Sequence, residues 1–211
     1  MSNDKFVIED TILKEVNKRL RKVKIPEGVT SIAEGVFENC KSLQSIVIPD
    51  SVTFIGRGNF FRCFNLQSVV IPDGVTSIKK EAFRDCTSLE SVIIPNSVTS
   101  IGEDAFFMCT SLESVVIPDS VTSIGESAFD KCSSLQSVII PNSVTSIGIC
   151  AFNGCTSLES IVIPDSVTSI KKCAFDGCTS LKTINFNGTR NQWKELKLKL
   201  DGNIIVKCSD D

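Results

Sequence analysis

A unit of 23 residues recurs seven times along this chain, and no other feature constrains the fold as strongly. The unit reads I-P-D-S-V-T-S-I-G-E-S-A-F-D-K-C-T-S-L-E-S-V-V, and its copies run from Ile25 to Asn185 of the 211 residues. Every copy keeps proline at position 2, phenylalanine at position 13 and cysteine at position 16. A repeat of this length is typical of a solenoid, in which each copy buries its apolar residues only against neighbouring copies.

Three segments of the unit carry different patterns. The segment L-x-x-V-x-I alternates in its second half, as in Leu112, Val115 and Ile117, which predicts a strand with one buried face. Proline follows and lacks an N–H group, so it is expected where the strand ends. S-V-T-S-I-G predicts a second short strand or an extended edge. E-S-A-F-D-K-C spaces its apolar residues 3 and 4 apart, which predicts one or two helical turns.

Stacking places identical positions above one another at about the strand spacing of ~4.8 Å. The phenylalanine, leucine, isoleucine and valine columns then form one continuous core. An open stack needs caps at its ends. We therefore expect a single domain with an N-terminal cap in residues 1–24, seven repeats in 25–185 and a C-terminal cap in 186–211. Trp193 is expected to plug the last phenylalanine and isoleucine columns.

The pattern L-x-x-V-x-I-P-x-x-V-T-x-I-G-x-x-A-F-x-x-C resembles the BspA-like leucine-rich repeat family of the Treponema pallidum type. The segment NFNGTRNQWKEL, Asn185 to Leu196, is similar to the closing segment often seen after such repeats. The resemblance implies an α/β repeat solenoid: a right-handed leucine-rich-repeat superhelix, strand-rich, with a concave parallel sheet and short helical or 3-10 returns. It also implies adhesion, partner binding and a cell-surface or secreted location, with no catalytic residues.

The composition narrows the chemistry. The chain has no histidine, which excludes Ser-His-Asp and Cys-His nucleophilic sites and removes the commonest general base near neutral pH. Its ten cysteines show no CxxC spacing of a zinc site. The net charge of -3 is small, and cations do not interleave with aromatics along one face, so nucleic-acid binding has little support. We expect no enzyme, no catalytic residue, no metal and no cofactor.

Membrane and location signals are also weak. No run of 18 apolar residues is present, so membrane insertion is not expected. The start, MSNDKFVIED, shows no secretory signal, whereas the family resemblance points outside the cell. Location is therefore left open.

Seven of the cysteines recur every 23 residues, and we interpret them as a buried, reduced column that behaves as small hydrophobic residues. A redox or metal ladder is the alternative. Cys150 and Cys173 form a second adjacent pair at position 11, nearer the surface, for which oxidation to a disulfide is a separate hypothesis.

The first candidate binding surface lies on the predicted strand. By alternation, positions 21 and 23 point away from the core, which places a hydroxyl column beside an aliphatic one. Exposed aliphatic columns often mark interaction sites, although valine and isoleucine suit strands wherever they point. Acidic columns at positions 3 and 20 flank this face. The candidate residues are Ser91, Ile93, Ser114, Val116, Ser137, Ile139, Ser160 and Val162.

The second candidate is the most unusual copy, IPDSVTFIGRGNFFRCFNLQSVV. Phe54, Phe61 and Phe64 take positions 7, 14 and 17, which are polar in most copies, and Phe107 shares the column of Phe61. Aromatics beside arginine are typical of interfaces. The alternative is that the N-terminal cap folds over them.

Together these patterns predict a non-catalytic protein-binding or adhesion scaffold that acts through the concave sheet and its flanking columns. Its partner is a protein that the sequence does not identify. The alternative is a self-associating structural module, a homo-oligomer joined through the aliphatic column or the aromatics of the second copy.

Overall fold

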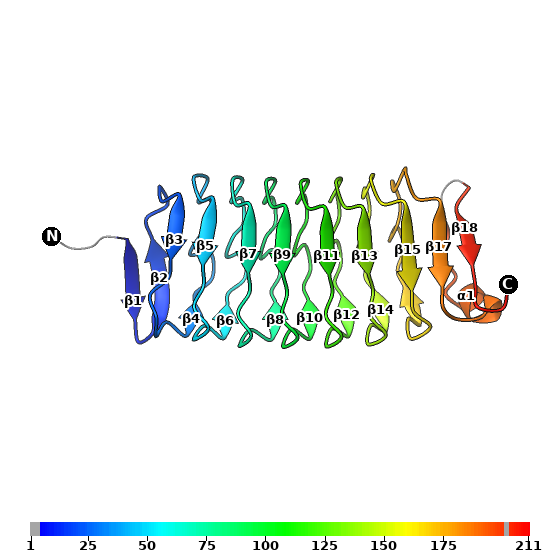
Figure 1. The fold of residues 1–211 in the computed structure, drawn as a ribbon, viewed down its shortest axis with the longest axis horizontal. Helices are drawn as coiled ribbons and strands as arrows, with labels where there is room; N and C mark the ends of the chain where they lie inside the picture. The colour runs from blue at the N-terminus through cyan, green and yellow to red at the C-terminus, as the bar shows by residue number, and fades with distance from the viewer. Residues whose placement is uncertain (1–4, 201–202) are drawn as a thin grey trace.

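The computed structural model describes residues 5–200 and 203–211, which form a β-solenoid of about eight turns with parallel sheets and almost no helix. In Figure 1 the turns lie side by side across the view, with the two termini at opposite ends of the stack. The predicted strand-rich solenoid is confirmed. The right-handed superhelix and the concave shape of the sheet stay predictions.

Each turn contributes a three- or four-residue strand from the L-x-x-V-x-I segment, and we call these strands the S-V-V row. The row consists of two parallel sheets, in each of which the strands follow chain order. The first contains β3 (Lys22–Lys24), β5 (Ser45–Val47), β7 (Ser68–Val70) and β9 (Ser91–Ile93). The second contains β11 (Ser114–Val116), β13 (Ser137–Ile139), β15 (Ser160–Ile163), β17 (Thr183–Phe186) and β18 (Ile205–Lys207).

The S-V-T-S-I-G segment forms a second row of two-residue strands, which we call the S-I row. One sheet joins β1 (Phe6–Glu9), β2 (Ile12–Val16), β4 (Ser31–Ile32) and β6 (Phe54–Ile55). The other joins β8 (Ser77–Ile78), β10 (Ser100–Ile101), β12 (Ser123–Ile124), β14 (Ser146–Ile147) and β16 (Ser169–Ile170). Both rows are labelled in Figure 1.

Identical positions pair across neighbouring turns. Ser114 pairs with Ser137 and Val116 with Ile139 in the S-V-V row, and Ser100 pairs with Ser123 in the S-I row. One repeat of 23 residues is therefore one turn of the solenoid. This register is the reason why the same residue type recurs at each buried position, since each side chain packs on its own copy.

The phenylalanines at position 13 form the centre of the core. The seven rings, from Phe37 to Phe175, are stacked nearly parallel with neighbouring centroids 5.1–5.8 Å apart. Alanine, cysteine, leucine, isoleucine and valine columns surround them. Offset stacking of aromatic rings contributes beyond the burial of apolar area, so this column stabilises the stack along its whole length.

The return segment E-S-A-F-D-K-C is a run of turns rather than the predicted helical turns. In the fifth copy Ser127 and Lys131 have φ values of 50° and 60°, which lie in the left-handed region and interrupt a helix. The amide of Phe129 donates to Ala151 of the next turn, whereas that of Asp130 donates to Ser127 within its own turn. Every second amide of the return thus donates to the next turn of the solenoid and is not available for the hydrogen bonds of a helix.

The two ends of the stack differ from the repeats. At the N-terminal end β1 forms an antiparallel hairpin with β2, and β2 pairs in parallel with β4. At the C-terminal end the helix α1 (Arg190–Glu195) begins with a capping box between Thr189 and Gln192.

The ring of Trp193 tilts against Phe186 at 5.4 Å between centroids. Trp193 therefore packs on Phe186, the residue that replaces the first-position isoleucine. The rest of its predicted role as a plug stays a prediction.

Candidate functional site

The S-V-V row presents an exposed aliphatic column. Its six members are 43% to 68% exposed, although valine and isoleucine are usually buried. They are Val47, Val70, Ile93, Val116, Ile139 and Val162. The serine column beside it is exposed from Ser68 to Ser160. The eight sequence-predicted residues therefore lie on the exposed side of four successive strands, β9, β11, β13 and β15, which belong to the two sheets of the row. We call this exposed side of the row, with its hydroxyl and aliphatic groups, the S-V-V face.

Cations bound this column at both ends. Lys24 of β3 pairs in register with Val47. At the other end Val162 is followed in register by Asn185 and then by Lys207 of β18. The apolar part of the face is therefore limited to the six turns between these residues.

Acidic and amide side chains border the S-V-V face on both sides. Position 20 precedes each strand, and position 3 follows it at the start of the next turn. The position 20 residues are Gln44, Gln67, Glu90, Glu113, Gln136 and Glu159, and the position 3 residues are Asp50, Asp73, Asn96, Asp119, Asn142 and Asp165. Seven of these twelve are carboxylates and none is a cation; outside these six turns, position 20 of the last copy is Lys182 and position 3 of the first copy is Glu27, which pairs with Lys24. The two columns therefore give the face a negative border.

The aromatics of the second and fourth copies contact cations of neighbouring turns. The guanidinium of Arg84 lies 4.5 Å from the ring centroid of Phe107 and 6.0 Å from that of Phe61. Arg62 lies 4.8 Å from Phe61, and Lys131 lies 5.4 Å from Phe107. Such cation–π contacts stabilise a folded chain by about 0.5–1 kcal/mol each at exposed sites. Phe61, Arg84 and Phe107, at position 14 of the second to fourth copies, therefore form a short stack in which aromatic and cationic groups alternate. This corrects the expectation that cations do not interleave with aromatics.

The other two aromatics are engaged less closely. Phe54 is exposed, with the ammonium of Lys79 5.8 Å from its ring centroid, and the ammonium of Lys41 lies 5.9 Å from that of Phe64. All the cations over these rings come from the repeats rather than from residues 5–24. Covering of these rings by the N-terminal cap stays a prediction.

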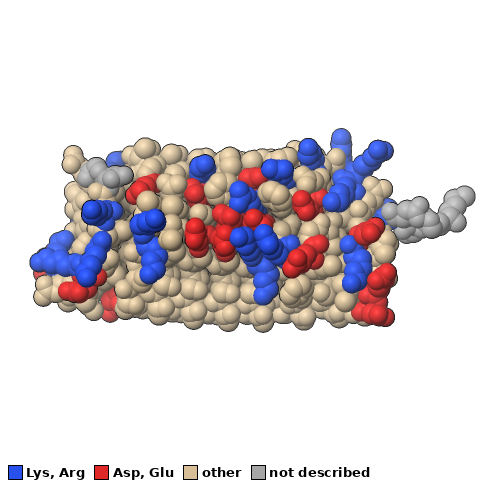
Figure 2. All heavy atoms as spheres, turned by 180° about the vertical axis from the view of Figure 1, so that it is seen from behind, with Lys and Arg blue, Asp and Glu red and all other residues tan. Residues whose placement is uncertain are grey.

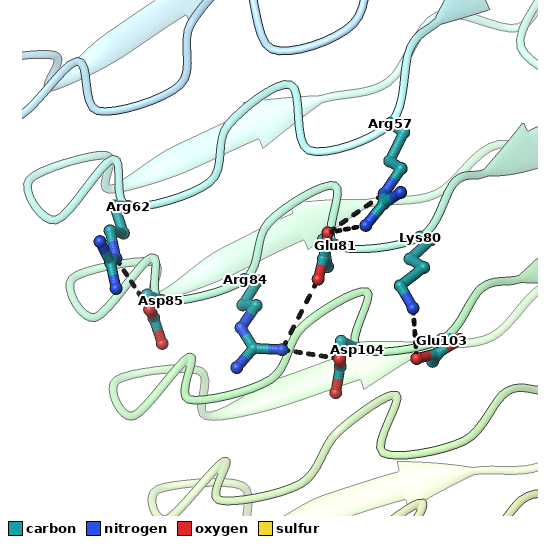
Figure 3. A network of polar contacts seen from close by, with 8 residues as sticks. All are labelled: Arg57, Arg62, Lys80, Glu81, Arg84, Asp85, Glu103 and Asp104. Atoms are coloured by element: carbon teal, nitrogen blue, oxygen red, sulfur yellow. Dashed lines mark hydrogen bonds and ion pairs between the residues drawn. The ribbon is translucent and has the colours of Figure 1, made fainter.

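Ion pairs tie the same turns together (Figure 3). Arg84 reaches Asp104 at 2.7 Å and Glu81 at 3.8 Å, and Arg57 binds Glu81 at 2.9 Å. Burial raises the pKa of the Asp104 carboxyl, although Arg84 acts in the opposite direction.

Two further ion pairs, Lys80 with Glu103 and Arg62 with Asp85, complete the network. Figure 2 shows acidic and basic side chains interspersed at the middle of one face, with cations gathered towards both ends.

The stack has a discontinuity around the third copy. Among the described residues, no strand pairing joins β6 to β8 or β9 to β11. Backbone hydrogen bonds link Thr99 to Thr76 and Gly102 to Ile78, but the corresponding bonds from Thr76 and Lys79 to the second copy are absent from the described residues. Nearby, Asn59 replaces the usual alanine, and its Oδ1 is buried with no hydrogen-bond partner among the described residues. The second and third turns are therefore joined less tightly on this side.

The cysteine column does more than fill volume. Each thiol from the second copy onward donates a hydrogen bond to the carbonyl of the phenylalanine one turn earlier, over 3.0–3.2 Å. Burial raises the pKa of thiols such as Cys86 and Cys109, so they stay protonated and able to donate. Sequence reasoning missed this bond; the constant spacing of three residues between phenylalanine and cysteine was the available signal.

Cys150 and Cys173 are half-buried on adjacent returns, and both have φ values in the left-handed region, at 53° and 60°. A hydrogen bond to Asp176 is the main cause that raises the pKa of the Cys173 thiol to about 11, and burial raises that of Cys150. These shifts lower the fraction of reactive thiolate at neutral pH. Oxidation of the pair stays a hypothesis.

A cluster of potential metal-ligating groups lies at the C-terminal end, where ligand atoms of Cys208, Asp210 and Asp211 come within 4.8 Å of one another. Arg190 already binds both carboxylates of this cluster, because its guanidinium pairs with Asp211 and its backbone amide donates to Asp210 over 2.7 Å. The cluster is therefore part of the C-terminal packing. No helix in residues 5–200 or 203–211 has the length and hydropathy that a membrane crossing requires.

A parallel β-solenoid built from one recurring unit, with each turn contacting its neighbours, is the architecture of repeat-protein scaffolds. A family model of the BspA type leucine rich repeat region matches six copies over residues 8–136 and 105–197. The chain therefore belongs to the BspA-type leucine-rich repeat family. A search of curated proteins gives no match.

Solved structures of bacterial proteins are similar to this one. A leucine rich cell surface protein from Faecalibacterium prausnitzii is 35% identical with a TM-score of 0.63, over 84% of this chain and 62% of that one. The leucine rich repeat protein of T. pallidum is 28% identical with a TM-score of 0.59, over 83% of this chain and 77% of that one. This chain thus spans less than two thirds of the Faecalibacterium protein.

Proposed function

We propose that this protein is a non-catalytic scaffold that binds a protein partner through the S-V-V face, and that this binding serves adhesion at a cell surface. The observation that carries the proposal is the column of six exposed aliphatic residues, one on each of six successive turns. Burying such a column against a partner is favourable by about 25 cal/mol per Å² of apolar surface. The cell-surface element is drawn from the similarity to the Faecalibacterium protein.

The chemistry of the chain supports a binding role rather than catalysis. It contains no histidine, and the column thiols from Cys63 to Cys178 donate hydrogen bonds to backbone carbonyls. We propose that it needs no metal or cofactor and that nucleic acid is not its ligand, since the borders of the face are acidic and would repel phosphates.

The test is capture of proteins from cells or host extracts on the immobilised chain. We expect the double variant Val116→Ser, Ile139→Ser to lose the captured partner while unfolding at the same urea concentration as the original. The matched control is Val7→Ser, Ile8→Ser, which removes two exposed aliphatic groups from β1. Retention of the partner by the first variant would contradict a role for the S-V-V face.

Self-association through the same aliphatic column is the second candidate. It predicts a concentration-dependent rise in sedimentation coefficient that Val116→Ser, Ile139→Ser abolishes. A monomer throughout the micromolar range would exclude it.

A further inference from the structure

The carboxylates that border the six turns of the aliphatic column differ from those on the returns in their charge partners, and the first cation in their columns on the C-terminal side is Lys182. None of the seven forms an ion pair among the described residues, whereas Glu81, Asp85, Glu103 and Asp104 on the returns all do. The seven are Asp50, Asp73, Glu90, Glu113, Asp119, Glu159 and Asp165. An apolar column with an uncompensated negative border on each side favours a ligand that is apolar along its middle and positive on both sides.

A second copy of this chain does not fit that description. A two-fold axis lying in the interface brings each acidic column either against its own copy or against the other acidic column. Both arrangements place carboxylates against carboxylates, and like charges at an interface disfavour association. The electrostatics of the face therefore favour a different protein over a homodimer.

The spacing of the column restricts the shape of the ligand. Parallel strands place one aliphatic side chain about every ~4.8 Å along the stack. An α-helix presents one turn every ~5.4 Å, whereas one face of an extended strand repeats only about every ~6.7 Å. A helix lying along the stack thus keeps an apolar side chain close to each turn of the solenoid, and a strand in the same direction does not.

We propose that the S-V-V face binds a basic amphipathic α-helix of a partner protein, lying along the solenoid axis. Its apolar stripe contacts the column from Val47 to Val162, and its lysines or arginines face the carboxylates at positions 3 and 20. Six turns of solenoid correspond to a helix of about 18 residues at ~1.5 Å per residue. Lys24 and Lys207 at the ends of the column repel further basic turns and set the limits of the contact. This inference rests on the proposed function and specifies the chemistry of its partner.

The probe is a synthetic helical peptide of 18 residues with a leucine stripe flanked on both sides by lysines. Its binding to the full chain is measured by isothermal titration calorimetry at low and high salt. One control peptide has the same composition in scrambled order, and another has glutamates in place of the lysines. We expect both controls to bind at least about tenfold more weakly, and the affinity of the lysine peptide to fall as salt rises. Equal binding of either control would overturn the proposal.

Charge reversal locates the site on the protein. The variant Glu90→Lys, Glu113→Lys changes position 20, where the last copy already has Lys182, so folding should be unaffected. We expect it to weaken binding of the lysine peptide about tenfold or more. The matched control, Glu126→Lys, Glu195→Lys, makes the same change in net charge at two exposed residues away from the face. Equal weakening by the two variants would show general charge attraction and refute the site.

The outcome also separates this inference from the proposed function. If captured proteins require Val116 and Ile139 but the lysine peptide does not bind, the partner is not a basic helix and the scaffold role stands. If neither the captured proteins nor the peptide depend on these residues, both proposals are wrong.

Discussion

The stacked phenylalanine column predicts that a central ring contributes about twice as much as a terminal one. Phe129 lies between Phe106 at 5.3 Å and Phe152 at 5.4 Å, whereas Phe37 has the single ring neighbour Phe60 at 5.3 Å. Both Phe129 and Phe37 are fully buried, so they lose similar apolar burial when replaced. Each stacked pair is worth about 0.5–1.5 kcal/mol beyond the burial of area.

The substitution Phe→Leu keeps most of the side-chain volume and removes the ring contacts. Phe129→Leu is expected to lower the free energy of unfolding by about 1–3 kcal/mol, because two pairs are lost. Phe37→Leu loses one pair, or about 0.5–1.5 kcal/mol. Urea unfolding followed by circular dichroism measures both values, and native-state hydrogen exchange checks that the terminal turn does not unfold separately. Equal losses in the free energy of unfolding for the two variants would refute the reasoning and would show that the phenylalanines contribute only by filling volume.

Three further predictions follow from the other contacts. A double-mutant cycle of Arg84→Met and Phe107→Leu should give a coupling of about 0.5–1 kcal/mol in urea unfolding; zero coupling would mean that these rings are free for a partner. The buried thiols should make the protein less stable in alkali, because burial raises their pKa above the ordinary value of 9.0. Their contribution to the free energy of unfolding is constant below about pH 9 and falls above it, as the thiols of the unfolded chain ionise, by about 1.4 kcal/mol per pH unit for each thiol. The variant Cys86→Ala, Cys109→Ala should show a shallower fall in the urea midpoint between pH 9 and pH 10, and an unchanged slope would contradict this. Finally, the amides of Thr76 and Lys79 should exchange with deuterium faster than those of Thr99 and Gly102, which donate to the preceding turn over 2.9 Å; equal protection would show that the second and third turns are joined as tightly as the rest.

Much of the fold could be predicted because the same sequence pattern occurs in seven copies, so that a conclusion drawn for one copy applies to the others. Alternation around Val115 predicted which face of the strand is buried, and the recurrence of proline predicted where each strand ends. The return was predicted wrongly, because its spacing of apolar residues suits a short helix. Its conformation is decided by left-handed residues such as Ser127 and Lys131 and by hydrogen bonds to the next turn. The spacing of apolar residues within one copy indicates neither of these features.

The candidate surfaces divide in the same way. The exposure of Val116 and Ile139 follows from strand alternation, which is a local property. The contacts of Phe61 and Phe107 do not, because Arg84 lies between them only when the three copies are stacked. Gly148 shows the same limit: a Cβ at this position would come within 2.5 Å of the backbone of Gly125, a closeness that exists only between turns.

The sequence by itself thus determined the solenoid, its period and the two columns that face outwards, since each copy has no other way to bury its apolar residues. The tertiary structure decided which charges are neutralised. Cations on the returns meet carboxylates of the next turn, while the seven carboxylates that border the aliphatic column meet none among the described residues. The reason is geometric: stacking brings together residues 23 positions apart, and the sign of each neighbouring charge is known only once that register is set.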